Sequence, residues 1–506
     1  MLFNSYIFIL CFLPLTVAGY FIINKYKKKE KGTADLWWLF LASSWFYGYA
    51  GPVCLILLLL SIGVNFFVSR KINSGRAQKH LPGARKWMLF GVVFNVALLA
   101  YFKYFEFFVE NLNPIFRQDW TVKNLIVPLG ISFFTFKQIA YIADCYREQE
   151  EVCYSWIEYA VYVMFFPQLI SGPIGLHYEF VPQIRDKARK TVSYENLSQG
   201  LYAVALGLGK KVLIADTLSK LVAVGYGDVE SLSSVSAWFV MIAYTLQIYF
   251  DFSGYSDMAL GVEKMLNLEP VLNFNSPYKA KTVGEFWNRW HMSLTRFFTR
   301  YVYIPLGGSR KGKPRTYMNT LLVFLLSGLW HGANWTFILW GFFHGLFMTM
   351  EKAIKDLWKR AVGFNISSPL LLWLGKLVGT VYTFLFVNLA WVLFRASSVT
   401  QAKTLLGKLF GAEGSMSSEI LEKANDLVEV RVLARLGMEG VFDSNPMLPC
   451  MAIMGGLIFG VFFLKNTQEK IKIEKYGIWR SVITVILIVW SVISFSDVSE
   501  FLYFNF

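Results

Sequence analysis

Charged residues are scarce in this 506-residue sequence: Asp, Glu, Lys and Arg together make up 16% of it, whereas 55% is hydrophobic. A typical soluble domain is about 25% charged, so this composition argues against a soluble fold. The sequence instead predicts an all-α polytopic membrane protein, with one integral-membrane domain over residues 1–506. The apolar runs lie near residues 2–23, 36–68, 87–109, 125–143, 156–174, 199–225, 235–255, 320–350, 369–394, 448–464 and 481–496.

Sites that rely on cysteine or on a short catalytic motif are also missing. The five cysteines are scattered and have neither metal-ligand spacing nor a paired pattern. No Gly-x-Ser-x-Gly sequence is present, so no nucleophile elbow is expected. The stretch GLGKK at residues 207–211 is not a phosphate-binding loop, because Lys211 occupies the position where Ser or Thr would bind magnesium. We therefore expect no bound metal and no bound cofactor.

The net charge of +15 comes largely from basic residues in short loops between apolar runs. Residues 25–31 contain five Lys and one Glu, residues 70–86 contain six basic residues and no acid, and residues 279–315 contain nine basic residues and one acid. Such loops face the cytoplasm in membrane proteins. They predict contact with a lipid bilayer, not with nucleic acid, and they place both chain termini on the extracytoplasmic side.

Two of the apolar runs are too long for a single spanning helix. Residues 36–68 lie between two cytoplasmic loops, so this run must go out and back, with a break near Gly51 and Pro52. Residues 320–350 would form a straight helix of about 46 Å, against a hydrocarbon core of about 30 Å. A break near residues 332–334 would create a re-entrant pair. Broken helices must be buried in protein or line a cavity, so we expect a ring of helices around a thin or hollow centre.

His331 would then lie near the deepest point of that re-entrant pair, in a stretch without any Asp, Glu, Lys or Arg. A polar group at membrane depth is costly unless it is satisfied, so such a residue is a functional candidate by default. Ser327 and Asn334, at positions i−4 and i+3, would share its helix face. The alternative interpretation is a histidine that is buried for structural reasons only.

The stretch 278–318 alternates aromatic and basic residues and contains His291. The simplest interpretation is an amphipathic helix at the cytoplasmic interface, with Trp and Arg at the headgroups. Such a helix can frame a cavity mouth, and its basic face suits the phosphates of an acyl carrier. His291 is either functional there or an ordinary interfacial histidine. Asp251 ends the run 235–255, where a carboxylate is more often paired with Lys or Arg than catalytic.

Four motifs carry a resemblance to a known family: YFDFSGYSD at residues 249–257, FWNRWHMS at 286–293, YIPLGG at 303–308 and GLWHG at 328–332. In this order they resemble the membrane-bound O-acyltransferase family, especially its bacterial alginate O-acetyltransferase-like branch. The resemblance covers nearly the whole chain. It implies about eleven spanning helices, with short re-entrant and interfacial helices, in a ring around a thinned central cavity. It also implies that His331 is the central catalytic histidine and His291 a second functional one. Asn288 and Asp251, which lie within these motifs, are candidate supporting residues.

The resemblance further implies an activity in the bacterial inner membrane. Members of this family move an acyl group from a cytoplasmic thioester, either acetyl-CoA or a phosphopantetheine carrier, to a hydroxyl reached from the other face. We expect O-acetylation of an extracytoplasmic polysaccharide, completed by an esterase-like extracytoplasmic partner. Two alternatives stay open. One is D-alanyl transfer to teichoic acid, and the other is a proton-coupled transporter, against which the lack of an internal repeat counts.

The C-terminal residues 500–506, EFLYFNF, resemble a short aromatic motif found in such systems. There a tyrosine is a proposed transient acyl acceptor, which makes Tyr503 a candidate acceptor in this chain. The alternative is an aromatic belt that anchors the last helix at the membrane surface.

Overall fold

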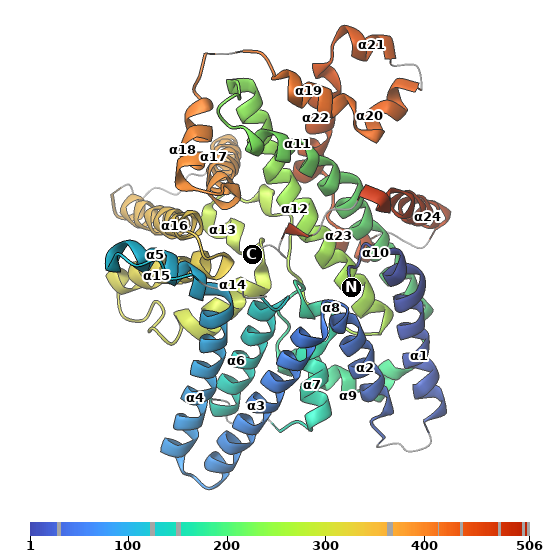
Figure 1. Ribbon diagram of the computed structural model, residues 1–506, viewed down its shortest axis with the longest axis vertical. Coiled ribbons are helices and arrows are strands. Elements are labelled where there is room, and N and C mark those ends of the chain that lie inside the picture. Colours follow the sequence, from blue (N-terminus) through green and yellow to red (C-terminus); the bar gives the residue numbers. More distant parts are fainter. Residues whose placement is uncertain are drawn as a thin grey trace.

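The computed structural model describes residues 1–27, 32–121, 127–147, 153–361, 368–412, 414–435, 439–473, 477–497 and 501–502. Within these ranges every regular element is a helix, which confirms the all-α prediction (Figure 1). Five described helices are long and apolar enough to cross a membrane: Phe8–Tyr26, Pro52–Ala77, Leu81–Phe116, Ser234–Met265 and Pro369–Arg395. Two shorter apolar helices cover Leu448–Phe463 and Ile478–Ile493. The expected count of about eleven spans, the thinned centre and the single domain stay predictions.

The N-terminal third contains the predicted break at Gly51 and Pro52. Gly51 has a φ of +134°, which a side chain would disfavour, and Pro52 begins the next helix, where its missing N–H costs nothing. The helices here are α1 (Leu13–Tyr26), α2 (Ala34–Gly48), α3 (Pro52–Ala77), α4 (Leu81–Leu99), α5 (Phe105–Phe116), α6 (Ile131–Arg147), α7 (Trp156–Met164), α8 (Phe166–Leu169) and α9 (His177–Arg185). Two π-helical segments, η1 (Phe8–Phe12) and η2 (Ala100–Tyr104), lie before α1 and between α4 and α5.

The middle of the molecule is built on α12 (Ser234–Met265), which is buried over most of its length and runs through the centre of Figure 1. It packs against α10 (Tyr194–Leu208), which continues through η4 (Gly209–Ala215) into α11 (Asp216–Gly227). A Cβ at Gly200 or Gly207 of α10 would lie 2.4 or 2.6 Å from a backbone oxygen of α12. The two backbones therefore touch, as small residues permit in membrane helix pairs.

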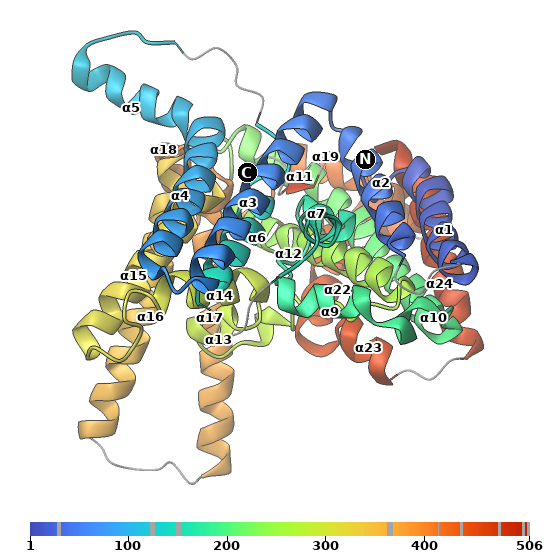
Figure 2. The same ribbon diagram turned by 90° about the horizontal axis from the view of Figure 1, so that it is seen from below.

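The C-terminal part contains the second predicted break. α15 ends at His331 and α16 begins at Trp335, so the run 320–350 does divide at residues 332–334. The two helices pack side by side, with the Cα of Gly341 3.2 Å from where a Cβ on Gly328 would be. The elements are α13 (Val283–Trp287), α14 (Met292–Phe298), α15 (Lys313–His331), α16 (Trp335–Ala361), α17 (Pro369–Arg395), α18 (Val399–Lys408), α19 (Ser418–Asn425), α20 (Val428–Leu433), α21 (Glu439–Ser444), α22 (Met447–Phe463), α23 (Thr467–Ile473) and α24 (Ile478–Ile493). Figure 2 shows α16 and α17 extending together beyond the other helices.

One expectation from the sequence is wrong. The stretch 278–318 is not one interfacial helix; it is divided into α13, α14, the π-helical segment η6 (Thr299–Tyr303) and the start of α15. The apolar run 156–174 contains only the nine-residue α7 and the four-residue α8, because the chain leaves the helical region at Phe165. Phe286, Trp287 and Trp290 are buried inside the protein and do not face lipid headgroups. Their aromatic contacts with one another and with α15–α17 outweigh the amphipathic pattern.

Candidate active site

His331 is the last residue of α15 and is buried. The backbone becomes extended at Gly332, and a Cβ there would lie 2.2 Å from the ring of Phe337, so a side chain at this position would force the ring to shift. Three aromatic rings surround the imidazole, with centroid distances of 4.6 Å to Trp330, 5.1 Å to Trp340 and 5.0 Å to Phe394. The helix end therefore presents His331 within an aromatic enclosure.

His291 lies in the turn between α13 and α14. Its φ of 43° is in the left-handed region, which residues with a side chain rarely adopt. Its Nδ1 is 3.0 Å from Oδ1 of Asn273, which also accepts from the backbone N–H and the hydroxyl of Ser293. Because a carbonyl oxygen only accepts, this arrangement assigns the proton of the neutral ring to Nδ1. Nε2 then carries the lone pair and is the nitrogen suited to proton transfer.

The structure brings the two predicted histidines to one cluster, although they are 40 positions apart in the sequence. The ring of Trp330 contacts both, at 4.6 Å from His331 and 6.1 Å from His291. Phe133 of α6 completes the group, at 5.6 Å from Trp330 and 6.4 Å from His291. A third buried histidine, His344, accepts a hydrogen bond from the indole N–H of Trp287 at 3.1 Å.

The supporting residues separate into two kinds. Ser327 is buried one turn before His331, and it lines a cavity of about 210 Å³ together with Asn288, the residue that follows α13. Asn334 does not share the face of His331, because α15 has already ended. Its Oδ1 instead accepts from the N–H of Thr336 at 3.0 Å, and its amide donates to the carbonyl of Ser397. Asn334 therefore caps the start of α16.

Asp251 has the lysine partner that its position predicted, and a second partner that the sequence did not indicate. Its Oδ1 is 2.6 Å from Nζ of Lys211, which also binds Asp216 at 2.9 Å. Its Oδ2 accepts the backbone N–H of Leu502 at 3.0 Å, and the ring of Phe501 lies 4.5 Å from the same Nζ. The buried Asp251–Lys211 pair thus anchors the C-terminal segment. Tyr503 itself lies outside the described residues.

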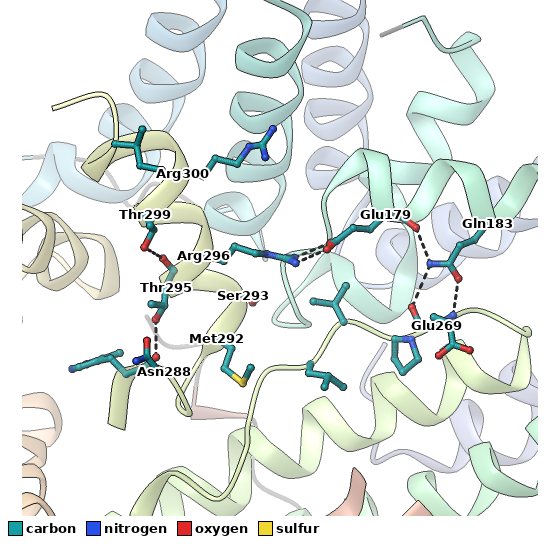
Figure 3. A pocket seen from close by; sticks show the side chains of 15 residues that line it. Glu179, Gln183, Glu269, Asn288, Met292, Ser293, Thr295, Arg296, Thr299 and Arg300 are labelled. Carbon is teal, nitrogen blue, oxygen red and sulfur yellow. Dashed lines mark hydrogen bonds and ion pairs between the residues drawn. The ribbon is translucent and has the colours of Figure 1, made fainter. Parts of the chain in front are cut away.

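A larger cavity of about 890 Å³ is lined in part by α14 (Figure 3), and His291 itself is not among its lining residues. Met292 and Ser293, the two residues after His291, line it, as do Arg296 and Arg300. Each arginine has a carboxylate partner: Arg296 makes a two-point ion pair with Glu179, and Arg300 lies 3.2 Å from Asp144. The cavity wall is therefore less basic than the sequence of residues 279–315 indicated.

Asn273 is the contact at this site that sequence reasoning missed. It lies 18 residues before His291, in a segment without regular structure, and no motif connects the two. Its only sequence signal is its place in the polar stretch NFNS at residues 273–276, which follows a long apolar helix.

Comparison with known proteins identifies the family of this chain. Residues 7–391 match the family model for MBOAT, the membrane-bound O-acyltransferase family. The chain is 37% identical to the peptidoglycan O-acetyltransferase of Helicobacter pylori, over all of this chain and 98% of that protein. It is 36% identical to the probable alginate O-acetylase AlgI of Pseudomonas aeruginosa, over 84% of this chain and 78% of that one. The teichoic acid D-alanyltransferase of Bacillus subtilis is 30% identical over 45% of this chain and 59% of its own length. The chain therefore belongs to the membrane-bound O-acyltransferase family, as a multi-pass O-acetyltransferase.

Proposed function

We propose that this protein acetylates an extracytoplasmic polysaccharide with an acetyl group taken from a cytoplasmic thioester. The observation that carries the proposal is the convergence of His291 and His331 on Trp330, together with a cavity of about 890 Å³ that is lined by the two residues after His291. The similarity to the two O-acetylating relatives spans most or all of the chain, whereas the D-alanyl relative matches less than half of it. Acetyl transfer is therefore favoured over D-alanyl transfer.

In the proposed reaction His331 is the general base. It takes the proton of the acceptor hydroxyl while the hydroxyl oxygen attacks the thioester carbonyl carbon. The carbon–sulfur bond then breaks, and the departing thiolate takes up the proton. His291, with its Nδ1 held by Asn273, presents Nε2 to position the donor or to relay that proton. The donor is acetyl-CoA or an acetylated phosphopantetheine carrier, and its phosphates would compete with Glu179 and Asp144 for Arg296 and Arg300 at the cavity wall.

The acetyl group must also cross the membrane, because the positive-inside distribution puts residues 279–315 in the cytoplasm and the C-terminus outside. We assign the first acceptor hydroxyl to Tyr503, which directly follows the anchored residue Leu502. The phenol has a free pKa of about 10, so it needs a base such as His331 to attack at neutral pH. An esterase-like extracytoplasmic partner then passes the acetyl group to the polysaccharide.

The test uses the purified full-length protein in proteoliposomes with radiolabelled acetyl-CoA or acetylated carrier protein. The measured step is the loss of the labelled acetyl thioester together with the appearance of label on the protein, because transfer to a polysaccharide also requires the extracytoplasmic partner. His331→Ala should lower acetyl transfer by about 10²–10⁴-fold. The matched control is His344→Gln, since His344 is equally buried and contacts Trp340 in the same aromatic group but has no assigned chemistry. Turnover by the His331→Ala protein at the wild-type rate would refute the assignment.

A further inference from the structure

Lys103 connects the N-terminal helices to the end of α15. It belongs to the π-helical segment η2, and its Nζ lies 2.5 Å from the carbonyl oxygen of Trp330 and 3.3 Å from that of His331. The same Nζ is 3.5 Å from the hydroxyl of Ser132 and 5.7 Å from the ring of Trp330. The lysine and His331 are separated by 228 positions in the sequence. A single side chain from a distant segment thus holds the two terminal carbonyls of the helix that carries His331.

The C-terminal end of α15 needs a hydrogen-bond donor such as the Lys103 side chain. The last four carbonyls of an α-helix have no partner within the helix, and they carry its negative dipole end. α15 ends abruptly, because the chain becomes extended at Gly332 and leads directly to α16. A lysine both hydrogen-bonds these carbonyls and offsets the dipole. The contact therefore stabilises the helix end in one conformation, and the direction of the terminal residue is fixed with it.

The helix that carries Lys103 is irregular at this point. α4 and α5 form one continuous helix except for the five π-helical residues Ala100–Tyr104. A π segment accommodates one extra residue, and one residue in an α-helix corresponds to a rotation of about 100°. With a regular helix through this segment, Lys103 would project in another direction relative to α4. The irregularity directs the lysine at α15.

We propose that Lys103 is a positioning residue for acetyl transfer, which orients His331 by holding the carbonyls of Trp330 and His331. This rests on the proposed role of His331 as the base. Lys103 does not have to touch either substrate. Its loss should therefore lower kcat and leave the affinity for the donor nearly unchanged.

Lys137 of α6 provides a matched control. Its Nζ donates to the carbonyl of Tyr162 at 3.1 Å and to the side chain of Gln168 at 2.9 Å, and it lies 5.3 Å from the Tyr162 ring. The two lysines have the same chemistry: each is held by a helix carbonyl and an aromatic ring. Lys137 holds α7, which carries neither His291 nor His331.

The experiment compares full-length Lys103→Met, Lys103→Arg and Lys137→Met in lipid nanodiscs. Transfer from labelled acetyl-CoA gives kcat and KM, each normalised to the monodisperse protein fraction, and thermal unfolding gives stability. Lys103→Met should lower kcat by about tenfold or more, with KM for the donor within about twofold of wild type. Lys103→Arg keeps the charge and the donors and should restore most of the loss. Lys137→Met should lower thermal stability without a comparable fall in kcat.

A wild-type kcat for Lys103→Met would overturn the inference, as would an equal loss of kcat in Lys137→Met. The His331→Ala protein separates this result from the proposed function. If His331→Ala is inactive and Lys103→Met is fully active, only the positioning role fails. If His331→Ala is active, the proposed base is wrong, whatever Lys103 does.

Discussion

Asp251→Asn should release the C-terminal segment from its anchor. The carboxylate uses one oxygen for Lys211 and the other for the N–H of Leu502, whereas an asparagine has only one oxygen to offer. A hydrogen bond to a charged group contributes about 1.5–3 kcal/mol, so losing the Leu502 contact should lower the ratio of docked to released tail by about tenfold or more. The fold itself should persist, because Lys211 keeps its ion pair with Asp216.

The matched control is Asp257→Asn on the same helix. Asp257 pairs with Lys210 at 2.6 Å and accepts from Thr467 at 2.6 Å, and none of its described contacts involves the C-terminal residues 501–502. Carboxypeptidase digestion of the intact protein measures tail release, and labelled acetyl transfer to polysaccharide measures its consequence. Asp251→Asn should speed digestion and reduce transfer, whereas Asp257→Asn should change neither beyond its effect on stability. Equal behaviour of the two variants would refute the anchoring role of Asp251.

Three further changes test other parts of the structure. Tyr503→Phe should abolish acetylation of the polysaccharide while the protein still inserts in the membrane, and mass spectrometry of the wild-type C-terminal peptide should detect a labile acetyl adduct; a normal rate would leave the segment as an anchor only. Gly332→Ala should cost about 1–3 kcal/mol and reduce transfer, measured by thermal unfolding and turnover, because its Cβ would meet Phe337 at 2.2 Å while the extended backbone itself accepts alanine. Glu158→Gln should lower thermal stability at neutral pH but not in acid. Burial raises the pKa of the Glu158 carboxyl, but the hydrogen bonds from Arg185 outweigh this effect and hold the pKa below its usual value. The stabilisation is therefore present above the unfolded pKa of about 4.3 and is lost as pH falls through the folded pKa. Persistence of the difference between variant and wild type in acid would contradict this.

The breaks at residues 48–52 and 332–334 were predictable because they follow from length: a run longer than the hydrocarbon core must bend, and glycine and proline mark the place. His291 and His331 were predictable as candidates because histidine is out of place in such apolar surroundings. Their convergence on Trp330 was not, since it depends on how α13–α15 pack. The same packing explains why Phe286, Trp287 and Trp290 are buried when the spacing of the aromatic residues suggested an interfacial helix.

Three contacts between distant segments could not be predicted from the sequence. Asn273 reaches His291, Lys103 reaches the end of α15, and Leu502 reaches Asp251, and in each case nothing in the local pattern names the partner. Asn334 shows the opposite error. Its spacing from His331 assumed a continuous helix, and the end of α15 at His331 makes it a cap for α16. The break predicted at residues 332–334 already separates Asn334 from the helix of His331, so the helix face inferred from the i+3 spacing was inconsistent with that break.

The close glycine contact between α15 and α16 also bears on how the chain enters the membrane during synthesis. As a separate helix, α15 would expose the side chains of Ser327 and His331 to lipid, where each costs free energy. With Gly328 packed against Gly341, α16 helps to enclose both polar side chains within protein. The two helices are therefore expected to leave the insertion machinery as one unit. We therefore expect His331 to become enclosed by protein only once α16 has been synthesised.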